Sequence, residues 1–118
     1  MAVHLDLGKL GEKLAEEYLI KNGYNILYRN WRYSHYEIDI IATKSNLIHF
    51  VEVKIRTSKK FGFPEESVTK KKIKSLLNAV DEFLFRHPVY KNFHLDILSI
   101  STNRNSEPEY LLIEDVYI

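Results

Sequence analysis

Hydrophobic residues recur along the chain at two spacings, one typical of helices and one typical of strands. Leucines three or four residues apart predict a helix over residues 6–21, with Asp6 as its N-cap and Gly23 at its end. A second apolar stripe follows Thr69, a residue suited to cap a helix, and stops before Pro88. The pattern therefore predicts two amphipathic helices, one at the start of the chain and one past its middle.

Five segments are rich in β-branched and aromatic residues, which is typical of strands. They are residues 24–31, 37–44, 47–55, 93–101 and 109–117. Ser45-Asn46 and residues 102–108 are polar turns, and a loop over 56–67 leads to the second helix. The order α-β-β-β-α-β-β predicts an α/β fold in which helices flank a mixed β-sheet.

A two-residue turn at Ser45-Asn46 sets the register of the strands on either side of it. Lys44 then pairs with Leu47 and Ile41 with Phe50. Continuing the register places two charged pairs at one end of the same face: Asp39 opposite Glu52, and Glu37 opposite Lys54. The rest of that face is apolar, and so is the reverse face, which is expected to hold Ile38, Ile40, Val51, Val53 and Ile55.

Carboxylates held close together repel each other, and a hard divalent cation relieves this cost. Asp39 and Glu52 would offer oxygen ligands to Mg²⁺ or Mn²⁺, with the Val53 carbonyl as a third. Lys54 would orient the attacking water or stabilise charge on a phosphoryl group. Glu12, beside the glycines of the first helix, would reach the metal directly or through water. A structural reading stays open, with a Glu37–Lys54 ion pair, solvated acids and a surface Glu12.

Composition narrows the class of protein. The 118 residues suit a single domain over 1–118. The chain has no cysteine, which excludes disulfides and thiolate metal sites, and its five histidines lack zinc spacing. No signal peptide pattern is visible, and no apolar run reaches the roughly 20 residues of a spanning helix. A cytoplasmic protein without membrane contact is therefore expected.

The net charge is only +1, but basic residues are concentrated between residues 54 and 74. Aromatic residues also alternate with cations between Arg29 and Tyr36, a mixture suited to stacking on bases and contacting phosphates. The candidate nucleic-acid-binding residues are Arg29, Arg32, Arg56, Lys59, Lys60, Lys70 and Lys71. The alternative is a solvated loop and helix start, with Trp31 packed in the core.

Several short motifs occur in one order along the chain. They are Gly11-Glu12, Gly23-Tyr24-Asn25-Ile26-Leu27, Asn30-Trp31-Arg32, Glu37-Ile38-Asp39-Ile40-Ile41, Phe50-Val51-Glu52-Val53-Lys54-Ile55-Arg56 and Phe61-Gly62-Phe63-Pro64. Together they resemble the YraN family, also called UPF0102, whose bacterial members are similar to archaeal Holliday-junction resolvases. The resemblance spans residues 7–96. It differs at Tyr36, where relatives commonly have glycine, and at His94 and Leu95 in the late strand.

The resemblance implies a restriction-endonuclease-like fold with a PD-(D/E)xK-type site. Glu12, Asp39, Glu52 and Lys54 match the active residues of the family, with Glu37 in support. The leading hypothesis is a Mg²⁺- or Mn²⁺-dependent endonuclease for branched or structured DNA, acting as a homodimer by analogy with resolvases. Two alternatives are a non-catalytic nucleic-acid-binding module with the same fold and a protein-interaction or assembly module.

Overall fold

The structure, a computed structural model, describes residues 7–57, 69–103 and 106–116. Its elements follow the predicted order α-β-β-β-α-β-β. They are α1 (Leu7–Lys21), β1 (Asn25–Tyr33), β2 (Tyr36–Lys44), β3 (Leu47–Arg56), α2 (Lys70–Arg86), β4 (Phe93–Asn103) and β5 (Ser106–Ile113). In the part of the chain that is described, no helix is long and apolar enough to cross a membrane.

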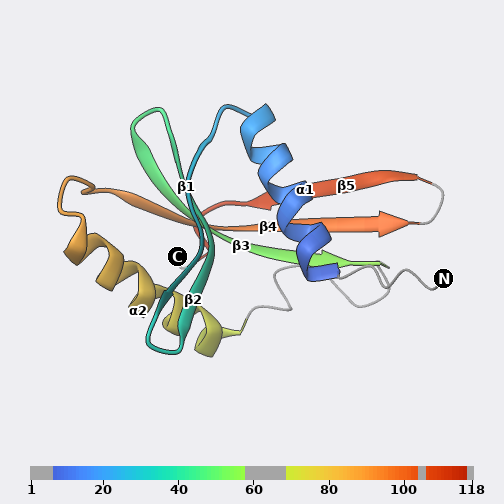
Figure 1. Cartoon of the computed structure of the whole chain (residues 1–118). Helices are drawn as coiled ribbons and strands as arrows, with labels where there is room; N and C mark the ends of the chain where they lie inside the picture. The colour runs from blue at the N-terminus through green and yellow to red at the C-terminus, as the bar shows by residue number, and fades with distance from the viewer. Residues whose placement is uncertain (1–6, 58–68, 104–105, 117–118) are drawn as a thin grey trace.

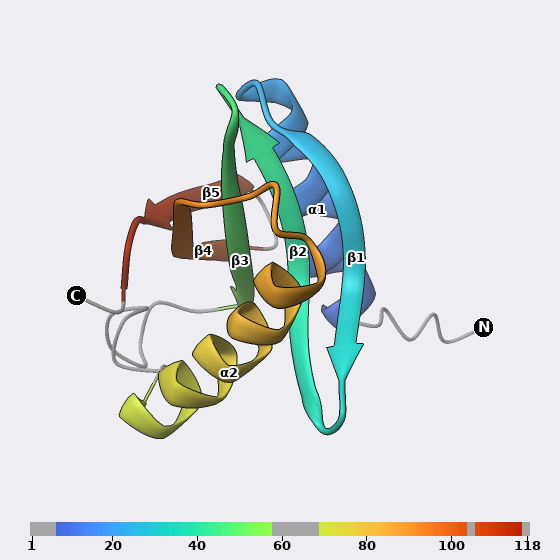
Figure 2. The ribbon, with the colours of Figure 1, turned by 90° about the vertical axis from the view of Figure 1, so that its left-hand side faces the viewer.

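The five strands form one mixed sheet in the order β1-β2-β3-β4-β5. All neighbouring strands are antiparallel except β3 and β4, which run parallel and are connected through α2. The two helices cover opposite faces of this sheet (Figures 1 and 2). This arrangement confirms the predicted α/β class, with helices flanking a mixed sheet.

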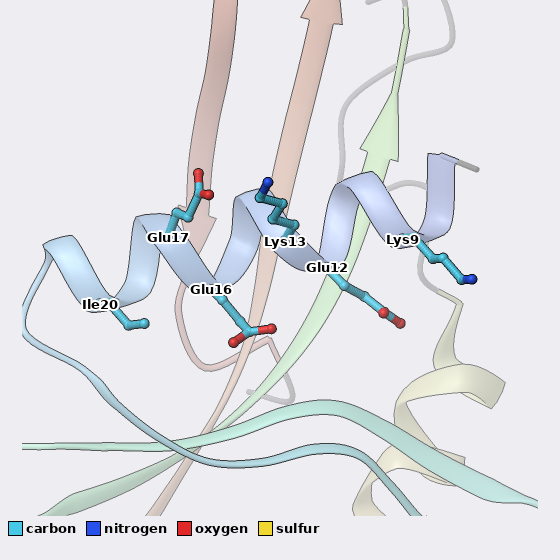
Figure 3. A pocket seen from close by; sticks show the side chains of 6 residues that line it. All are labelled: Lys9, Glu12, Lys13, Glu16, Glu17 and Ile20. Carbon is cyan, nitrogen blue, oxygen red and sulfur yellow. The ribbon is translucent and has the colours of Figure 1, made fainter. Parts of the chain in front are cut away.

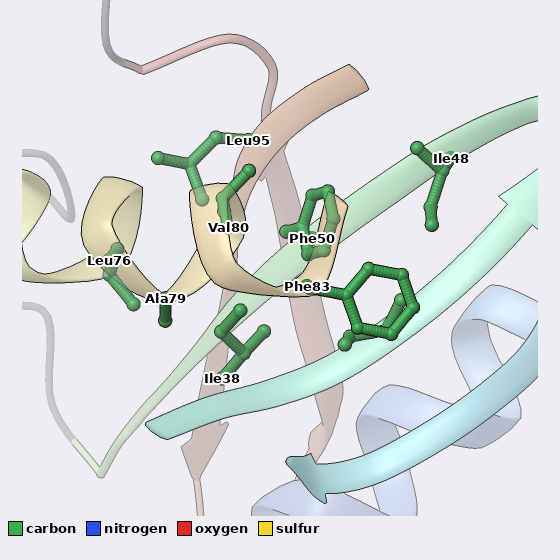
Figure 4. Close-up of a cluster of buried hydrophobic side chains, with 9 residues drawn as sticks. Ile38, Ile48, Phe50, Leu76, Ala79, Val80, Phe83 and Leu95 are labelled. Carbon is green, nitrogen blue, oxygen red and sulfur yellow. The ribbon is translucent and has the colours of Figure 1, made fainter. Parts of the chain in front are cut away.

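Each face of the sheet has its own hydrophobic core. The face under α2 holds Ile38, Ile41, Ile48, Phe50, Leu76, Ala79, Val80, Phe83 and Leu95 (Figure 4). The face under α1 holds Ala15, Leu19, Tyr24, Ile40, Ala42, Val51, Leu98 and Ile100. The ring of Phe83 meets those of Phe50 and Trp31 edge to face at 5.5 and 5.4 Å. Trp31 is thus a core-packing residue, the alternative that the sequence left open.

Residues next to the helices in the sequence set the end of α1 and the start of α2. Gly23 has a φ of +91° and ends α1, where its N–H donates to Ile20 O and the Tyr24 N–H donates to Leu19 O. These two bonds form a Schellman motif, which needs a left-handed residue at this position. Thr69 caps α2 by accepting a hydrogen bond from the Lys72 N–H at 3.1 Å. The predicted end at Gly23 and cap at Thr69 are therefore confirmed, whereas Asp6 lies outside the described residues.

The β2–β3 hairpin has the predicted register near its turn. Ser45 and Asn46 both have positive φ, 51° and 66°, as a two-residue type I′ turn requires. The pairs Lys44–Leu47 and Ile41–Phe50 are both present.

The β2–β3 register stops sooner than predicted, because the last paired residues are Ile40 and Val51. Asp39 and Glu37 lie beyond that end, so neither is paired with β3 in the ladder. Ile38 packs on the α2 face, although Ile40 packs on the α1 face. The prediction that Ile38 and Ile40 share a face is wrong, since the alternation of β2 is broken at Asp39.

The last strand was predicted three or four residues too late. β5 runs over Ser106–Ile113 rather than 109–117, because Pro108 lies within the strand and not in a turn. Proline lacks an N–H, but an edge strand and a bulge both tolerate it. β5 is an edge strand, and its register with β4 shifts between Ser101 and Asn103, beside this proline.

A paired set of histidines and aspartates ties the end of the chain to the sheet. His49 Nδ1 lies 2.9 Å from Asp96 Oδ2 in a buried contact, and Asp96 Oδ1 accepts from the Asp115 N–H at 3.0 Å. His94 Nδ1 lies 2.9 Å from Asp115 Oδ1, and its ring stacks on that of His49 at 4.6 Å. Both histidines therefore pack against each other and have carboxylate partners.

Replacing Gly23 by alanine is expected to lower the free energy of unfolding by about 1–2 kcal/mol, because a Cβ is disfavoured at its positive φ. No neighbour crowds the position, since the Lys44 Cε would lie 3.8 Å from the new Cβ. Urea titration of the two proteins measures the difference. Gly23→Asn serves as the comparison and should lose less, because asparagine tolerates this conformation; equal losses would point to a cause other than φ.

Replacing Asp96 by alanine is expected to lower the free energy of unfolding by about 3 kcal/mol, since it leaves the buried His49 Nδ1 and the Asp115 N–H without their partner. Asp81→Ala, on the exposed side of α2, is the matched control and should change stability by about 0.5 kcal/mol or less. Thermal and urea unfolding would test both variants. Similar values for the two would show that the Asp96 contacts contribute little.

Candidate functional site

Asp39 lies on β2 immediately past the last β2–β3 pair, where the two strands stop exchanging backbone hydrogen bonds. Its Oδ2 accepts a hydrogen bond of 2.8 Å from the Val53 N–H. A side chain of β2 thus accepts a hydrogen bond from the backbone of β3 at the point where the ladder ends. This bond holds the Asp39 carboxylate against β3.

Glu52 precedes Val53 and is the acid that Asp39 meets. Its carboxylate is close enough to that of Asp39 to raise the pKa of Asp39, and it is almost completely buried. Lys72, from the first turn of α2, places its Nζ 3.3 Å from Glu52 Oε2. The buried Glu52 Oε2 accepts no hydrogen bond from the described residues. Asp39 and Glu52 therefore lie near each other without the direct cross-strand pairing that the sequence predicted.

Burial raises the pKa of Asp39 from its usual value to about 8, and the hydrogen bond and charge of Glu52 add to this rise. The Val53 N–H and the positive charge of Lys72 favour the ionised form but do not outweigh burial. The acid pair therefore retains a proton at neutral pH when no other cation is present. A cation bound by both carboxylates would displace that proton.

Glu12 enters the site region from α1, and its position depends on close packing of that helix. A Cβ on Gly11 would lie 3.2 Å from the Cβ and Cγ2 of Ile55, so glycine lets α1 approach β3 closely. Figure 3 shows Glu12 and Glu16 projecting from the same side of α1. Glu16 ion-pairs with Arg29 of β1 at 2.6 Å.

Asn30 connects Glu12 to the hairpin. It stands opposite Asp39 on β1, between the pairs Arg29–Ile40 and Trp31–Ile38, and has a φ of 50°. With its amide nitrogen toward the acids, it donates to Glu12 Oε1 at 2.9 Å and to Glu37 Oε1 at 3.0 Å. Glu12 is thus linked to Glu37 through Asn30 rather than grouped directly with Asp39 and Glu52.

Glu37 and Lys54 do not form the cross-strand pair that the sequence register placed there. Glu37 is opposite Arg32 of β1, and the Arg32 guanidinium lies 3.4 Å from its Oε2. Lys54 is half-buried on β3, opposite Ser99 of β4. Within the described ranges, no ion pair joins Lys54 to an acid. The purely structural reading of these two residues as an ion pair is therefore wrong.

The carboxylates of Asp39 and Glu52 fit an open metal site that water and substrate complete, and not a site enclosed by protein ligands alone. Among the residues that the structure describes, no three or more acids or histidines gather closely enough to enclose an ion by themselves. Mg²⁺ commonly uses one or two carboxylates and completes its shell with water and substrate phosphates. Two adjacent carboxylates, one with a buried oxygen that accepts no hydrogen bond, suit this open arrangement.

The candidate nucleic-acid-binding residues have different surroundings. Arg29 and Arg32 are engaged by Glu16 and Glu37, and Arg56 is half-buried with contacts of its own. Lys70 and Lys71 are exposed on the first turn of α2. Lys59 and Lys60 lie outside the described residues.

Two residues near the acids were not predicted as site residues. Lys72 lies four residues before Leu76, the first buried residue of α2, and therefore on the same side of the helix. A lysine on the side of a helix that faces the core was a signal in the sequence. Asn30 carried no comparable signal, since its role depends on strand pairing and on the approach of α1.

Raising the pH is expected to weaken the contribution of Asp39 to stability. Because the folded-state pKa lies above the usual value of 3.8, that contribution is complete below about pH 4 and is lost as pH rises toward about 8. Asp39→Asn keeps an acceptor for the Val53 N–H but cannot titrate. Metal-free urea titrations at several pH values should show the variant gaining on the wild type by at most about 1.4 kcal/mol per pH unit.

The Asp39 prediction has a matched control in Asp81→Asn, which changes the same charge on the exposed surface of α2. Its stability relative to the wild type should stay constant between pH 5 and pH 8. A constant offset for Asp39→Asn as well would contradict the raised pKa.

Comparison with known proteins identifies relatives along most of the chain. The profile of the family described as "Uncharacterised protein family UPF0102" matches residues 11–100. A UPF0102 protein of Flavobacterium johnsoniae is 46% identical over 110 residues, covering 90% of this chain and 89% of the relative. One from Bacteroides thetaiotaomicron is 42% identical over 100 residues, covering 85% of this chain and 83% of the relative.

The fold is similar to that of Hjc from Archaeoglobus fulgidus, a Holliday junction resolvase. The TM-score is 0.53 at 14% sequence identity, with 93% of this chain and 78% of that chain covered. At this identity the similarity concerns the fold, which is restriction-endonuclease-like. The relatives and the matching family profile together establish that the chain belongs to the UPF0102 family.

Proposed function

We propose that this protein is a divalent-metal-dependent endonuclease that hydrolyses phosphodiester bonds in branched or otherwise structured DNA. The observation that carries the proposal is the buried carboxylate pair of Asp39 and Glu52 at the end of the β2–β3 ladder. Burying two acids side by side is costly, and an ordinary structural role does not require it. The fold shared with a Holliday junction resolvase supports the choice of substrate class.

The residues of the chain have separable roles in this proposal. Asp39 and Glu52 would hold Mg²⁺ or Mn²⁺, and the Val53 N–H orients the Asp39 carboxylate. A divalent cation bound there would supply Lewis-acid polarisation of the phosphodiester and would lower the pKa of water. Lys54, two residues after Glu52 on β3, acts on the phosphate or on the attacking water.

Glu12 and the basic residues serve the edges of this site. Asn30 positions Glu12, which assists through water. Exposed Lys70 and Lys71 contact backbone phosphates, which gives affinity that falls with salt and carries no sequence preference. These roles favour recognition of DNA structure over recognition of sequence.

Cleavage is expected to require metal and to disappear when either acid is neutralised. Fluorescent four-way junction, flap, single-stranded and duplex DNA would be incubated with the protein and Mg²⁺, Mn²⁺ or EDTA. Asp39→Asn, Glu52→Gln and Lys54→Met should each lower the rate about a hundredfold or more, because each removes a group that acts on the reacting centre. Asp81→Asn, remote from the acids on the exposed side of α2, should cleave at the wild-type rate.

The same assay separates the proposed enzyme from its alternatives. Salt-sensitive binding without cleavage would indicate a nucleic-acid-binding module with the same fold. Neither binding nor cleavage on any of the four substrates would contradict both nucleic-acid functions and would favour a protein-interaction module.

A further inference from the structure

Lys72 makes an ion pair that spans two elements with very different exposure. Its Nζ lies 3.3 Å from Glu52 Oε2, and the Glu52 side chain is 6% exposed whereas that of Lys72 is 44% exposed. Lys72 is on the first turn of α2, four residues before the buried Leu76, so it extends from the side of the helix that faces the sheet. The buried Glu52 on β3 is therefore paired with Lys72, whose side chain is partly exposed to solvent.

A nearby positive charge offsets part of the cost of burying the acid pair. An uncompensated buried carboxylate is strongly destabilising. Glu52 Oε2 accepts no hydrogen bond from the described residues, so the charge of Lys72 is its compensation. Lys72 also acts on the neighbouring Asp39, where its charge favours the ionised carboxylate.

A divalent metal and the Lys72 ammonium would compete for the same oxygen. Mg²⁺ binds carboxylate oxygens at about 2.0–2.1 Å, and its charge would repel an ammonium group held 3.3 Å from the same oxygen. A hollow between the β1–β2 turn and α2 adjoins Lys72 and is lined by His35, Tyr36, Glu37, Lys72, Ser75 and Leu76. Glu37 in this hollow offers the displaced ammonium another carboxylate.

We propose that Lys72 is a resident counter-ion that occupies the metal position of the acid pair in the metal-free protein and leaves when a divalent cation binds. The inference rests on the proposed metal site. It assigns Lys72 a positioning role: it keeps Asp39 and Glu52 together before the metal arrives and lowers the affinity of the site for metal. Once displaced toward the hollow at the β1–β2 turn, the ammonium is available to a substrate phosphate.

Two opposite effects of one substitution test this role. Lys72→Gln should bind Mn²⁺ about three- to tenfold more tightly than the wild type in isothermal titration calorimetry, because the competing cation is gone. The same variant without metal should melt about 4 °C or more below the wild type, because Glu52 loses its compensating charge. A merely structural lysine would lower the melting temperature without tightening metal binding.

Lys74→Gln is the matched control, since it removes the same charge from an exposed position of the same helix. Tighter Mn²⁺ binding by Lys72→Gln than by Lys74→Gln supports the counter-ion role. Equal affinities, weaker binding by Lys72→Gln, or no Mn²⁺ binding by either variant or the wild type would overturn it. Lys72→Arg keeps the charge and should bind Mn²⁺ with nearly wild-type affinity.

A measurement on the wild-type protein covers the case in which Lys72→Gln does not fold. After reductive ¹³C-methylation of lysines, the Lys72 methyl signal should shift when Mg²⁺ is added, while the Lys74 signal should not. An unchanged Lys72 signal at saturating Mg²⁺ would contradict displacement.

Failure of this inference can be distinguished from failure of the proposed nuclease function. Wild-type DNA cleavage with equal Mn²⁺ affinities for the two lysine variants would overturn the role of Lys72 alone. Selective tightening in Lys72→Gln, with no cleavage of any DNA by the wild type, would support the counter-ion and overturn the nuclease.

Discussion

The hydrogen bond from the Val53 N–H to Asp39 Oδ2 is the constraint around which the rest of the site is arranged. It forms where β2 and β3 cease to pair, and it replaces strand pairing with a contact between a side chain and the backbone. The bond holds the Asp39 carboxylate of β2 beside Glu52, the residue that precedes Val53 on β3. It thus links β2 to β3 beyond their last backbone pair.

Holding two carboxylates together inside a protein has an electrostatic cost that the surrounding elements offset. The raised pKa of Asp39 shows that burial and repulsion from Glu52 outweigh the stabilising contacts. Lys72 supplies positive charge from α2, and Asn30 draws Glu12 and Glu37 together on the adjoining side. The two helices and the hairpin thus converge on one end of the sheet, which makes the arrangement dependent on the whole fold.

The buried acid that stabilises the fold and the acids of the candidate site lie at different positions on the sheet. The His49–Asp96 pair lies near the starts of the parallel strands β3 and β4, where it also ties down the segment after β5. Glu52 lies three residues farther along β3. The buried pair at the strand starts has its hydrogen-bonding groups matched, whereas Glu52 keeps an oxygen that accepts no hydrogen bond from the described residues. This contrast distinguishes a structural buried acid from one suited to bind a cation.

The sequence by itself determined the order of elements, the caps at Gly23 and Thr69 and the register next to the Ser45-Asn46 turn, because each depends on residues close together in the chain. It also indicated that Asp39 and Glu52 would be neighbours. Only the tertiary structure decided where the β2–β3 ladder ends and on which face Ile38 packs. The partners of Glu12 and Glu52 likewise come from β1 and α2, about 20 residues away. Such contacts depend on how helices pack across a sheet, and the local pattern of hydrophobic and polar residues does not specify which residues of two distant elements meet.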